Sequence, residues 1–343
     1  QNFSSQLGTG DRRNASRPTV TSTRTGLAGV TNLGGAGSHG CAVDGRAEVW
    51  CWGGNSVSQL GIPATLEPRR EPVNNGFDRV IAVEAGVAHT CAIRNDETVW
   101  CWGAGNTGAL GDGTQVRARA APVQARGLTD VVDLGLSNAH SCAVDRDGAV
   151  YCWGQNASRQ VGGQADFTVL VPVEVEGLDL NGRVVEVSAG SNHTCALYES
   201  GKVQCWGRGF EGQLGNGTNP TTSDVPVDVA RFSDFVQLDV GFSYACGVRR
   251  NGEVACWGAN DSGQVGDGTM FNVLEPTVVP GLPPSIVEVE ATFATSCARS
   301  SDGTLMCWGQ GVFGQIGDGS NSNAAVPVTV DRKSTRLNSS HYS

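Results

Sequence analysis

Lysine is scarce in this chain, basic residues are outnumbered, and long apolar runs are missing. Outside residues 332–343 the only lysine is Lys202, and the chain has 24 Lys+Arg against 34 Asp+Glu. This deficit of positive charge argues against nucleic acid and anionic membranes as partners, since both need a basic surface. No apolar run approaches the roughly 18–20 residues of a membrane helix, so we expect no membrane span.

Motifs for catalysis and cofactor binding are also missing. Gly201-Lys202 is followed by Val203, which excludes a P-loop, and no Gly-x-Ser-x-Gly nucleophile motif stands out. The Gly-Asp-Gly-Thr segments at 111–114 and 266–269 lack the acidic ladder of a calcium loop and are typical of turns. We therefore expect no enzyme activity, no cofactor and no metal site.

Glycine and cysteine, by contrast, are abundant, with 48 Gly and 12 Cys. The cysteines form pairs ten residues apart, and the pairs recur every 50, 51, 53, 51 and 51 residues. Six repetitions of one spacing indicate an internal repeat. The pairs are Cys41–Cys51, Cys91–Cys101, Cys142–Cys152, Cys195–Cys205, Cys246–Cys256 and Cys297–Cys307.

Each pair is predicted to bracket a β-hairpin. Between Cys195 and Cys205 the centre of symmetry is Ser200, so a three-residue loop over 199–201 joins two strands. Gly201 suits the third loop position, where a type I turn with a G1 bulge needs positive φ. Glycine recurs there at 148, 252 and 303, but Ala47 and Glu97 replace it in two repeats, where we expect a different turn.

This register makes each cysteine pair a candidate disulfide. Directly opposed cysteines in a non-hydrogen-bonded pair have Cα atoms about 4.5 Å apart, within the range that a disulfide accepts. We predict six cross-strand disulfides and hence an oxidising compartment: extracellular, periplasmic or cell-surface. Free thiols in a cytosolic protein are the alternative. Zinc on His-x-Cys is disfavoured, because Tyr244 and Thr295 replace the histidine in two repeats.

Each period carries four short strand signals and no sustained helical pattern. In one repeat the signals lie at 184–187, 193–197, 203–206 and 225–229. A repeat of about 51 residues with four strands predicts an all-β, seven-bladed β-propeller with four-stranded antiparallel blades. The tryptophans after each second cysteine are expected to fill the core between blades: Trp52, Trp102, Trp153, Trp206, Trp257 and Trp308.

These residues carry a family resemblance. The order Cys-Trp-Gly, Gly-Gln-Leu-Gly-Asp-Gly-Thr, Pro-Val, Ala-Gly and His-Thr-Cys-Ala-Leu resembles the regulator-of-chromosome-condensation repeat, most closely over 254–278 and 184–197. The resemblance implies a seven-bladed propeller, and the paired cysteines are similar to an extracellular bacterial branch of that family. It also implies, as an alternative function, guanine-nucleotide exchange on a small GTPase.

We expect one propeller domain over 1–331 and a non-native or disordered tail at 332–343, where the repeat is broken. The repeat units run over 1–44, 47–94, 98–145, 150–198, 203–249, 254–300 and 305–331. Strands are missing from the first and last units, so we expect a ring incomplete at both ends, or one blade shared between the termini. The chain begins with Gln1, and a secretion signal is expected to have been lost with a truncated N-terminus.

The function predicted from these features is a non-catalytic, secreted or cell-surface scaffold that binds protein. The loops after each Gln-Leu-Gly differ most between repeats, so they are the expected binding surface on a monomeric ring. Guanine-nucleotide exchange is the first alternative. A propeller-based enzyme, such as a lyase or a glycan-active enzyme, is the second. The sequence does not identify the partner.

Overall fold

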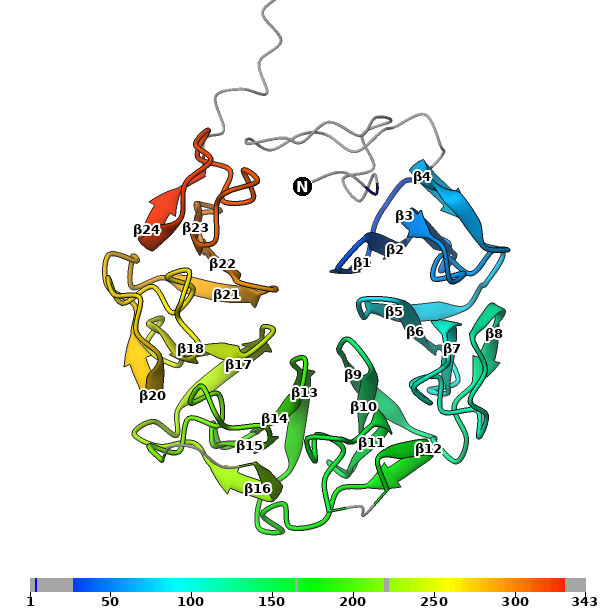
Figure 1. Cartoon of the computed structure of the whole chain (residues 1–343), viewed down its shortest axis with the longest axis horizontal. Coiled ribbons are helices and arrows are strands. Elements are labelled where there is room, and N and C mark those ends of the chain that lie inside the picture. The colour runs from blue at the N-terminus through cyan, green and yellow to red at the C-terminus, as the bar shows by residue number, and fades with distance from the viewer. Residues whose placement is uncertain (1–3, 5–26, 164–165, 219–221, 331–343) are drawn as a thin grey trace, which may run out of the picture.

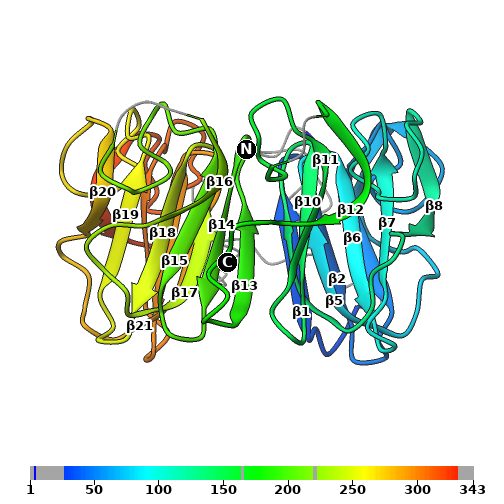
Figure 2. The ribbon, with the colours of Figure 1, turned by 90° about the horizontal axis from the view of Figure 1, so that it is seen from below.

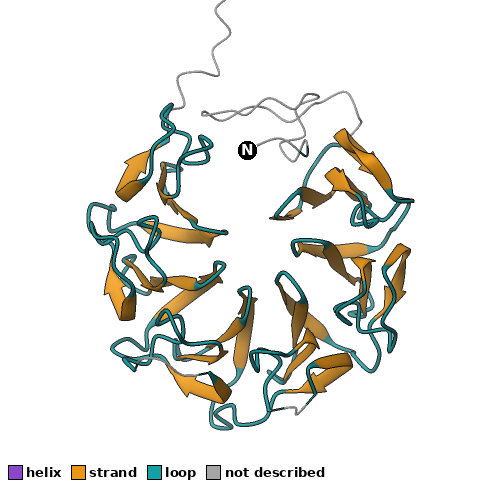
Figure 3. Cartoon of the chain, viewed as in Figure 1, coloured by secondary structure: helices purple, strands orange, loops and turns teal. Residues whose placement is uncertain are grey.

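The structure, a computed structural model, describes residues 4, 27–163, 166–218 and 222–330. Within these ranges the regular secondary structure is entirely β-strand, arranged as six four-stranded antiparallel sheets around a central axis (Figures 1 and 3). Strands that follow one another in the chain are neighbours in each sheet. The molecule is therefore a β-propeller, and each sheet is one blade.

The first three blades run from the N-terminal side of the ring. Blade 1 contains β1 (Asn32–Ala36), β2 (His39–Val43), β3 (Val49–Asn55) and β4 (Thr65–Asn74). Blade 2 contains β5 (Val80–Ala85), β6 (His89–Arg94), β7 (Val99–Ala104) and β8 (Ala118–Gln124). Blade 3 contains β9 (Val131–Leu136), β10 (His140–Asp145), β11 (Val150–Gln155) and β12 (Thr168–Glu174).

The last three blades continue around the axis. Blade 4 contains β13 (Val184–Ala189), β14 (His193–Tyr198), β15 (Val203–Gly207) and β16 (Ser223–Asp228). Blade 5 contains β17 (Phe235–Val240), β18 (Tyr244–Arg249), β19 (Val254–Gly258) and β20 (Val273–Val278). Blade 6 contains β21 (Ile286–Ala291), β22 (Thr295–Ser300), β23 (Leu305–Gly309) and β24 (Ala324–Thr329). The first strand of each blade lies nearest the axis (Figure 1).

The prediction of seven blades is wrong, because the described residues form six. The repeat units were counted from the Cys-Trp-Gly strand, which is the third strand of a blade. Each internal unit therefore spans the outer half of one blade and the inner half of the next. The units 1–44 and 305–331 supply two described strands each, which together equal one blade. Most of 1–26 and the tail 332–343 lie outside the described residues.

The cysteines lie opposite each other in the two central strands of each blade. Cys195 is the register partner of Cys205, and their Cα atoms are 4.1 Å apart. All six pairs, Cys41–Cys51 through Cys297–Cys307, form disulfides, and the described chain has no free cysteine. Every disulfide closes a hairpin inside one blade, so none joins two blades.

The hairpin turns are alike in all six blades, contrary to the expectation for Ala47 and Glu97. Ala47 has φ 62° and Glu97 has φ 61°, the same left-handed region as Gly201 at 94°. In both kinds of hairpin the third loop residue donates its N–H to the residue before the loop, as Gly201 does to Tyr198 (2.8 Å) and Ala47 to Asp44 (2.9 Å). The cross-linked strands therefore impose the turn even where glycine is missing.

The repeated tryptophans lie at the joints between blades. Five are fully buried, and each indole Nε1–H donates to a carbonyl in a loop of the preceding blade, as Trp206 does to Gln160 (2.9 Å). Trp52, in blade 1, is 7% exposed. The corresponding pairs are Trp102 with Gln59, Trp153 with Ala109, Trp257 with Gln213 and Trp308 with Gln264. The tryptophan thus packs and hydrogen-bonds across the joint.

A second hydrogen-bond chain crosses most joints beside the tryptophan. The Thr194 hydroxyl donates to the same Gln160 carbonyl (2.8 Å) and lies 2.8 Å from His140 Nε2 of the preceding blade. Since that hydroxyl hydrogen is used on the carbonyl, His140 Nε2 must carry a proton and donate. His39 and Thr90, His89 and Ser141, and Tyr244 and Ser296 form equivalent pairs. Burial suits the neutral ring and lowers the pKa of His140 to about 3.

Candidate functional site

The two flat faces of the propeller are built from different connections. On one face lie the hairpin tips between the first and second strands of each blade and the longer loops after the third strand; we call it the tip face. The opposite face, the base face, holds the cross-linked hairpin turns and the connections between blades. Figure 2 shows the ring edge-on, with both sets of loops. Tip and loop are hydrogen-bonded in each blade, as Ala104 N–H is to Ala88 O (2.9 Å).

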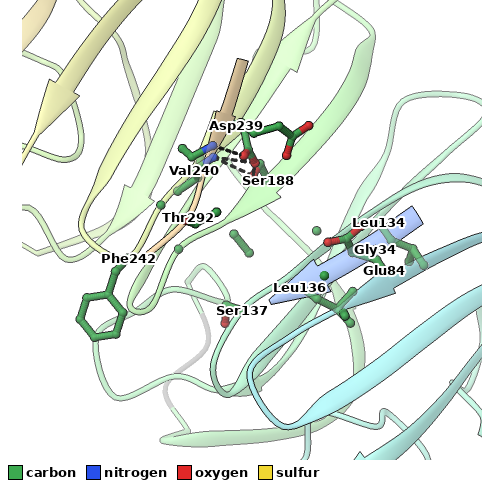
Figure 4. Close-up of a pocket in the computed structure, with 18 of the residues that line it drawn as sticks. Gly34, Glu84, Leu134, Leu136, Ser137, Ser188, Asp239, Val240, Phe242 and Thr292 are labelled. Atoms are coloured by element: carbon green, nitrogen blue, oxygen red, sulfur yellow. Dashed lines mark hydrogen bonds between the residues drawn. The ribbon is translucent and has the colours of Figure 1, made fainter. Parts of the chain in front are cut away.

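A cavity of about 470 Å³ lies where the first strands of the blades converge (Figure 4). It is lined by residues of β1, β5, β9, β13, β17 and β21, and by several hairpin tips. Of the residues that the structure describes, five carboxylates line it and no Lys, Arg or His does. The carboxylates are Glu84, Asp133, Glu186, Asp239 and Glu290.

The innermost strands are sheet edges, so their free N–H groups need partners. In four of these strands a side chain at one equivalent position supplies an acceptor to the next blade; it is the third residue of β9, β13 and β17 and the first residue of β1. Asp133 Oδ2 accepts from Val187 N–H (2.8 Å), and Asn32 Oδ1 accepts from Val83 N–H (2.7 Å). Glu186 and Gln237 act likewise on Leu238 and Val289. A polar side chain at this position therefore links neighbouring blades through a hydrogen bond to the backbone of the next first strand.

A second polar level lies two residues further along the same strands, nearer the tip face. Ser188 Oγ accepts from Val240 N–H (3.0 Å) and donates to Asp239 Oδ1 (3.0 Å), as Figure 4 shows. Asp239 Oδ2 accepts from Ala291 N–H (2.6 Å). Glu290 occupies this level in blade 6 and is exposed to the cavity. Its carboxylate has no hydrogen bond within the described part of the chain.

The cavity holds its carboxyl groups in an environment that disfavours their ionised form. Burial, together with Asp133, raises the pKa of Glu186 to about 9. Burial, together with Asp239, raises the pKa of Glu290 to about 8, and burial raises the pKa of Asp133 to about 6. The pKa values of Glu84 and Asp239 are also raised, chiefly by burial. Burial is the main cause of these raised pKa values, and neighbouring carboxylates add to it for Glu84, Glu186 and Glu290; a cation in the cavity would oppose both effects.

The exposed aromatic residues of the described chain all lie on the tip face. The side chains are Phe167, Phe210, Phe242, Phe271, Phe293 and Phe313. Phe242 and Phe293 occupy equivalent hairpin tips in blades 5 and 6, line the mouth of the cavity, and have ring centroids 4.6 Å apart. Exposed aromatic residues concentrated on one face mark an interaction surface.

Comparison with protein families identifies the repeat. The family model of the RCC1-like domain matches residues 1–341, nearly the entire chain. The chain belongs to the RCC1-like domain family. The sequence-based resemblance to the regulator-of-chromosome-condensation repeat is thereby confirmed.

Curated proteins related to this RCC1-like domain are longer than the part that it matches. The human E3 ubiquitin-protein ligase HERC2 is 30% identical over 218 residues, which is 62% of this chain and 4% of HERC2. The mitochondrial RCC1 domain-containing protein RUG3 of Arabidopsis thaliana is 28% identical over 58% of this chain and 46% of RUG3. The matched segment thus spans less than half of either relative.

Solved structures share the fold of this RCC1-like domain. Human WBSCR16 superposes with a TM-score of 0.83 at 22% identity, over 96% of this chain and 93% of that one. The Prp20p structure from Saccharomyces cerevisiae, reported with its binding to Gsp1p and histones, gives a TM-score of 0.78 at 23% identity, over 88% and 77%. At these identities the likeness concerns architecture alone.

The predicted site residues of this RCC1-like domain lie in its frame and not at the cavity. The disulfides close hairpins within blades, and the tryptophans pack between blades. Sequence reasoning missed the carboxylates that line the cavity and the phenylalanines at the hairpin tips. The signal for the carboxylates was available: Glu84, Asp239 and Glu290 occupy the same position, the fifth, of three equivalent first strands. Among the described residues no cluster of three or more His, Cys, Asp or Glu is arranged to hold a metal ion.

Proposed function

We propose that this RCC1-like domain is a non-catalytic scaffold that binds a protein partner through its tip face. The observation that carries the proposal is the placement of all six exposed phenylalanines of the described chain on that face. Phe271 is 80% exposed and Phe293 63% exposed, which costs solvation free energy in the free protein. Contact with a partner would recover it.

The frame beneath these loops supports a binding role. Disulfides stiffen every blade, and the tryptophan joints fix each blade against its neighbour. The loops after the third strands differ between blades although the strands beneath them repeat. A rigid ring with variable loops presents side chains to a partner at little cost in conformational entropy on binding.

The proposal extends to an oxidising compartment, as a secreted or cell-surface protein. Six disulfides per chain support it, since such bonds form and persist outside the reducing cytosol. The described residues include no helix with the length and apolar character that a membrane crossing requires. Thiol titration of the denatured, non-reduced protein from its native source should give no free thiol at these positions; twelve would overturn the placement.

Site-specific photo-cross-linking tests the binding face. Benzoylphenylalanine replaces Phe271 on the tip face or, as the control, Leu180, which is 98% exposed on the base face. In extracts of the source organism we expect a saturable cross-linked species from position 271 that excess unlabelled protein suppresses, and none from position 180. Equal cross-linking from both positions, or from 180 alone, would refute the tip face as the binding surface.

Guanine-nucleotide exchange is the second candidate, because Prp20p, which shares the fold, is reported with binding to Gsp1p. The disulfides disfavour it, since that activity belongs to reducing compartments. A nucleotide-release assay with a small GTPase of the source organism distinguishes the two. Release stimulated by the protein well above the spontaneous rate would replace the scaffold proposal.

A further inference from the structure

The aromatic residues of the tip face are concentrated over blades 4–6. Phe242 and Phe293 form the rim of the cavity there, and Phe210 and Phe271 lie on the loops after the third strands of blades 4 and 5. Each of the four is at least 38% exposed. In blades 1–3 the described chain has one exposed aromatic on this face, Phe167. The ring thus has an aromatic half and a polar half.

The same half is acidic. The loops after the third strands of blades 4–6 contain the carboxylates Glu211, Asp261, Asp267 and Asp318 and one guanidinium, Arg208. Arg208 is paired with Glu211 (2.5 Å) and lies over the Phe210 ring (5.1 Å to its centroid). The corresponding loops of blades 1–3 contain two carboxylates, Asp112 and Asp166, and two guanidiniums, Arg117 and Arg159. Negative charge therefore accompanies the aromatic residues.

The cavity extends this acidic surface inward. Glu290 is exposed to the cavity, and Asp239 lies on the first strand of the neighbouring blade. Asp239 precedes Phe242 by three residues, and Glu290 precedes Phe293 by three residues, so each carboxylate lies just before an aromatic tip. No cation lines the cavity within the described chain. Its volume of about 470 Å³ admits one or two long side chains. An entering ammonium or guanidinium group would meet carboxylates at the bottom and aromatic rings at the entrance.

We propose that blades 4–6 of the tip face bind a polypeptide segment that combines basic with large apolar side chains. A lysine or arginine of the partner enters the cavity toward Asp239 and Glu290, and its stem crosses the Phe242–Phe293 pair. Apolar neighbours in the segment pack against Phe271 and Phe210. This inference rests on the proposed protein-binding function and specifies the chemistry of the partner. Cation–π contact and charge complementarity both favour it.

Fluorescence anisotropy with three labelled peptides tests the chemistry on the whole purified chain. One short peptide alternates Lys and Arg with Leu and Phe; the second replaces its cations by Glu, and the third replaces its apolar residues by Ser. At about 0.15 M salt we expect the first to bind at least about tenfold more tightly than either control. Equal binding of all three, preference for the acidic peptide, or no binding would overturn the proposal.

Substitutions locate the site. Phe293→Ala should weaken binding of the first peptide about tenfold, and Glu290→Gln about threefold. Phe167→Ala is the matched control, because it removes an exposed phenylalanine from the polar half, and it should leave affinity unchanged. Circular dichroism and a free-thiol count confirm that each variant is folded. A loss in Phe167→Ala equal to that in Phe293→Ala would contradict the assignment to blades 4–6.

Two other outcomes are informative. Sedimentation that shows a concentration-dependent dimer, abolished by Phe271→Ser, would mean that a second copy covers the aromatic half and would overturn the proposal. Cross-linking from position 271 together with failure of the basic peptide would refute the partner chemistry and leave the binding face intact. Failure of both experiments would refute the proposed function itself.

Discussion

The joint between blades 3 and 4 and the joint between blades 4 and 5 share a backbone but differ in one hydroxyl. At the first, Thr194 links His140 to the Gln160 carbonyl with two 2.8 Å contacts. At the second, Ala245 occupies the threonine position, and His193 is fully buried with neither ring nitrogen hydrogen-bonded among the described residues. The Tyr244 backbone approaches that ring without a well-aligned hydrogen bond.

This difference shows that each joint depends on a residue from two repeats. The histidine Nε2 forms a hydrogen bond across the joint only where the next repeat supplies a hydroxyl. At the joint between blades 5 and 6, Tyr244 replaces the histidine: its hydroxyl donates to the Thr295 carbonyl (2.9 Å) and lies 3.0 Å from the Ser296 hydroxyl, which donates to the Gln264 carbonyl (2.8 Å). The network is restored at the following joint, so the defect is confined to one place.

Acid should affect all the histidine joints and has the largest expected effect. Burial lowers the pKa of His39 and His140 to about 3 and of His89 and His193 to about 4, from 6.5. A lowered pKa contributes stability above 6.5 that is lost as pH falls toward the folded value. Each pKa unit corresponds to about 1.4 kcal/mol, so acid should lower the free energy of unfolding by several such steps.

The carboxylates that line the cavity have the opposite effect on the pH dependence of stability. Their raised pKa values contribute stability below the ordinary value of 4.5 that is lost as pH rises toward about 9 for Glu186 and about 8 for Glu290. The two sets oppose each other between pH 4.5 and 6.5. Urea titrations should therefore show stability falling below about pH 4.5 and above about 6.5. A profile flat from pH 3 to 9 would contradict both sets of pKa shifts.

Breaking the complete joint is the next largest effect. Thr194→Val keeps the shape but removes the hydroxyl, leaving buried His140 Nε2 without its acceptor. We expect a loss of about 2–3 kcal/mol in the free energy of unfolding, measured by urea at pH 7 with disulfides intact. Because Trp206 still donates to the Gln160 carbonyl, the joint should not come apart. A loss below about 0.5 kcal/mol would mean that the hydrogen-bond chain adds nothing to packing.

Completing the defective joint is the reverse experiment. Ala245→Ser places a hydroxyl between His193 and the Gln213 carbonyl, as Ser141 and Ser296 do in their blades. We expect a gain of about 1 kcal/mol and a downfield change in the His193 ring-nitrogen chemical shifts. The same substitution should bring the two joints to similar sensitivity in hydrogen exchange. Destabilisation by this variant would indicate that the site has no room for the hydroxyl.

The smallest effect concerns the turns, where repeats also differ in sequence over one backbone. Ala47 has positive φ at a position where four other hairpins have glycine. Ala47→Gly should raise stability by about 0.5–1 kcal/mol, since relief of the left-handed strain exceeds the added unfolded-state entropy. Gly201→Ala is the reverse change and should lose more stability than Ala47→Gly gains, because an added Cβ would also lie 2.8 Å from Asp234 Cα. Equal and negligible effects in thermal unfolding would show that the disulfide alone fixes the turn.

The cysteine spacing predicted the hairpins because a hairpin is a local structure whose register follows from loop length. The blade number did not follow, because a repeat has no intrinsic starting point and a unit counted from the Cys-Trp-Gly strand divides every blade in two. The turns at Ala47 and Glu97 were misjudged, since single-residue preferences of about 1 kcal/mol yield to a cross-linked pair of strands. The cavity depends on convergence of six strands, which no single repeat reveals.

The confinement of every disulfide to one hairpin has a mechanical consequence. Pulled from its ends, the chain would behave as six stiff beads connected by non-covalent contacts, and blades would detach one by one without any covalent bond breaking. The ten-residue separation in each blade is locked out of the extensible length, about 30–35 Å per blade at full extension. Reduction of the disulfides would release this length in equal increments of chain extension, one for each blade, because the cysteine separation is the same in all six.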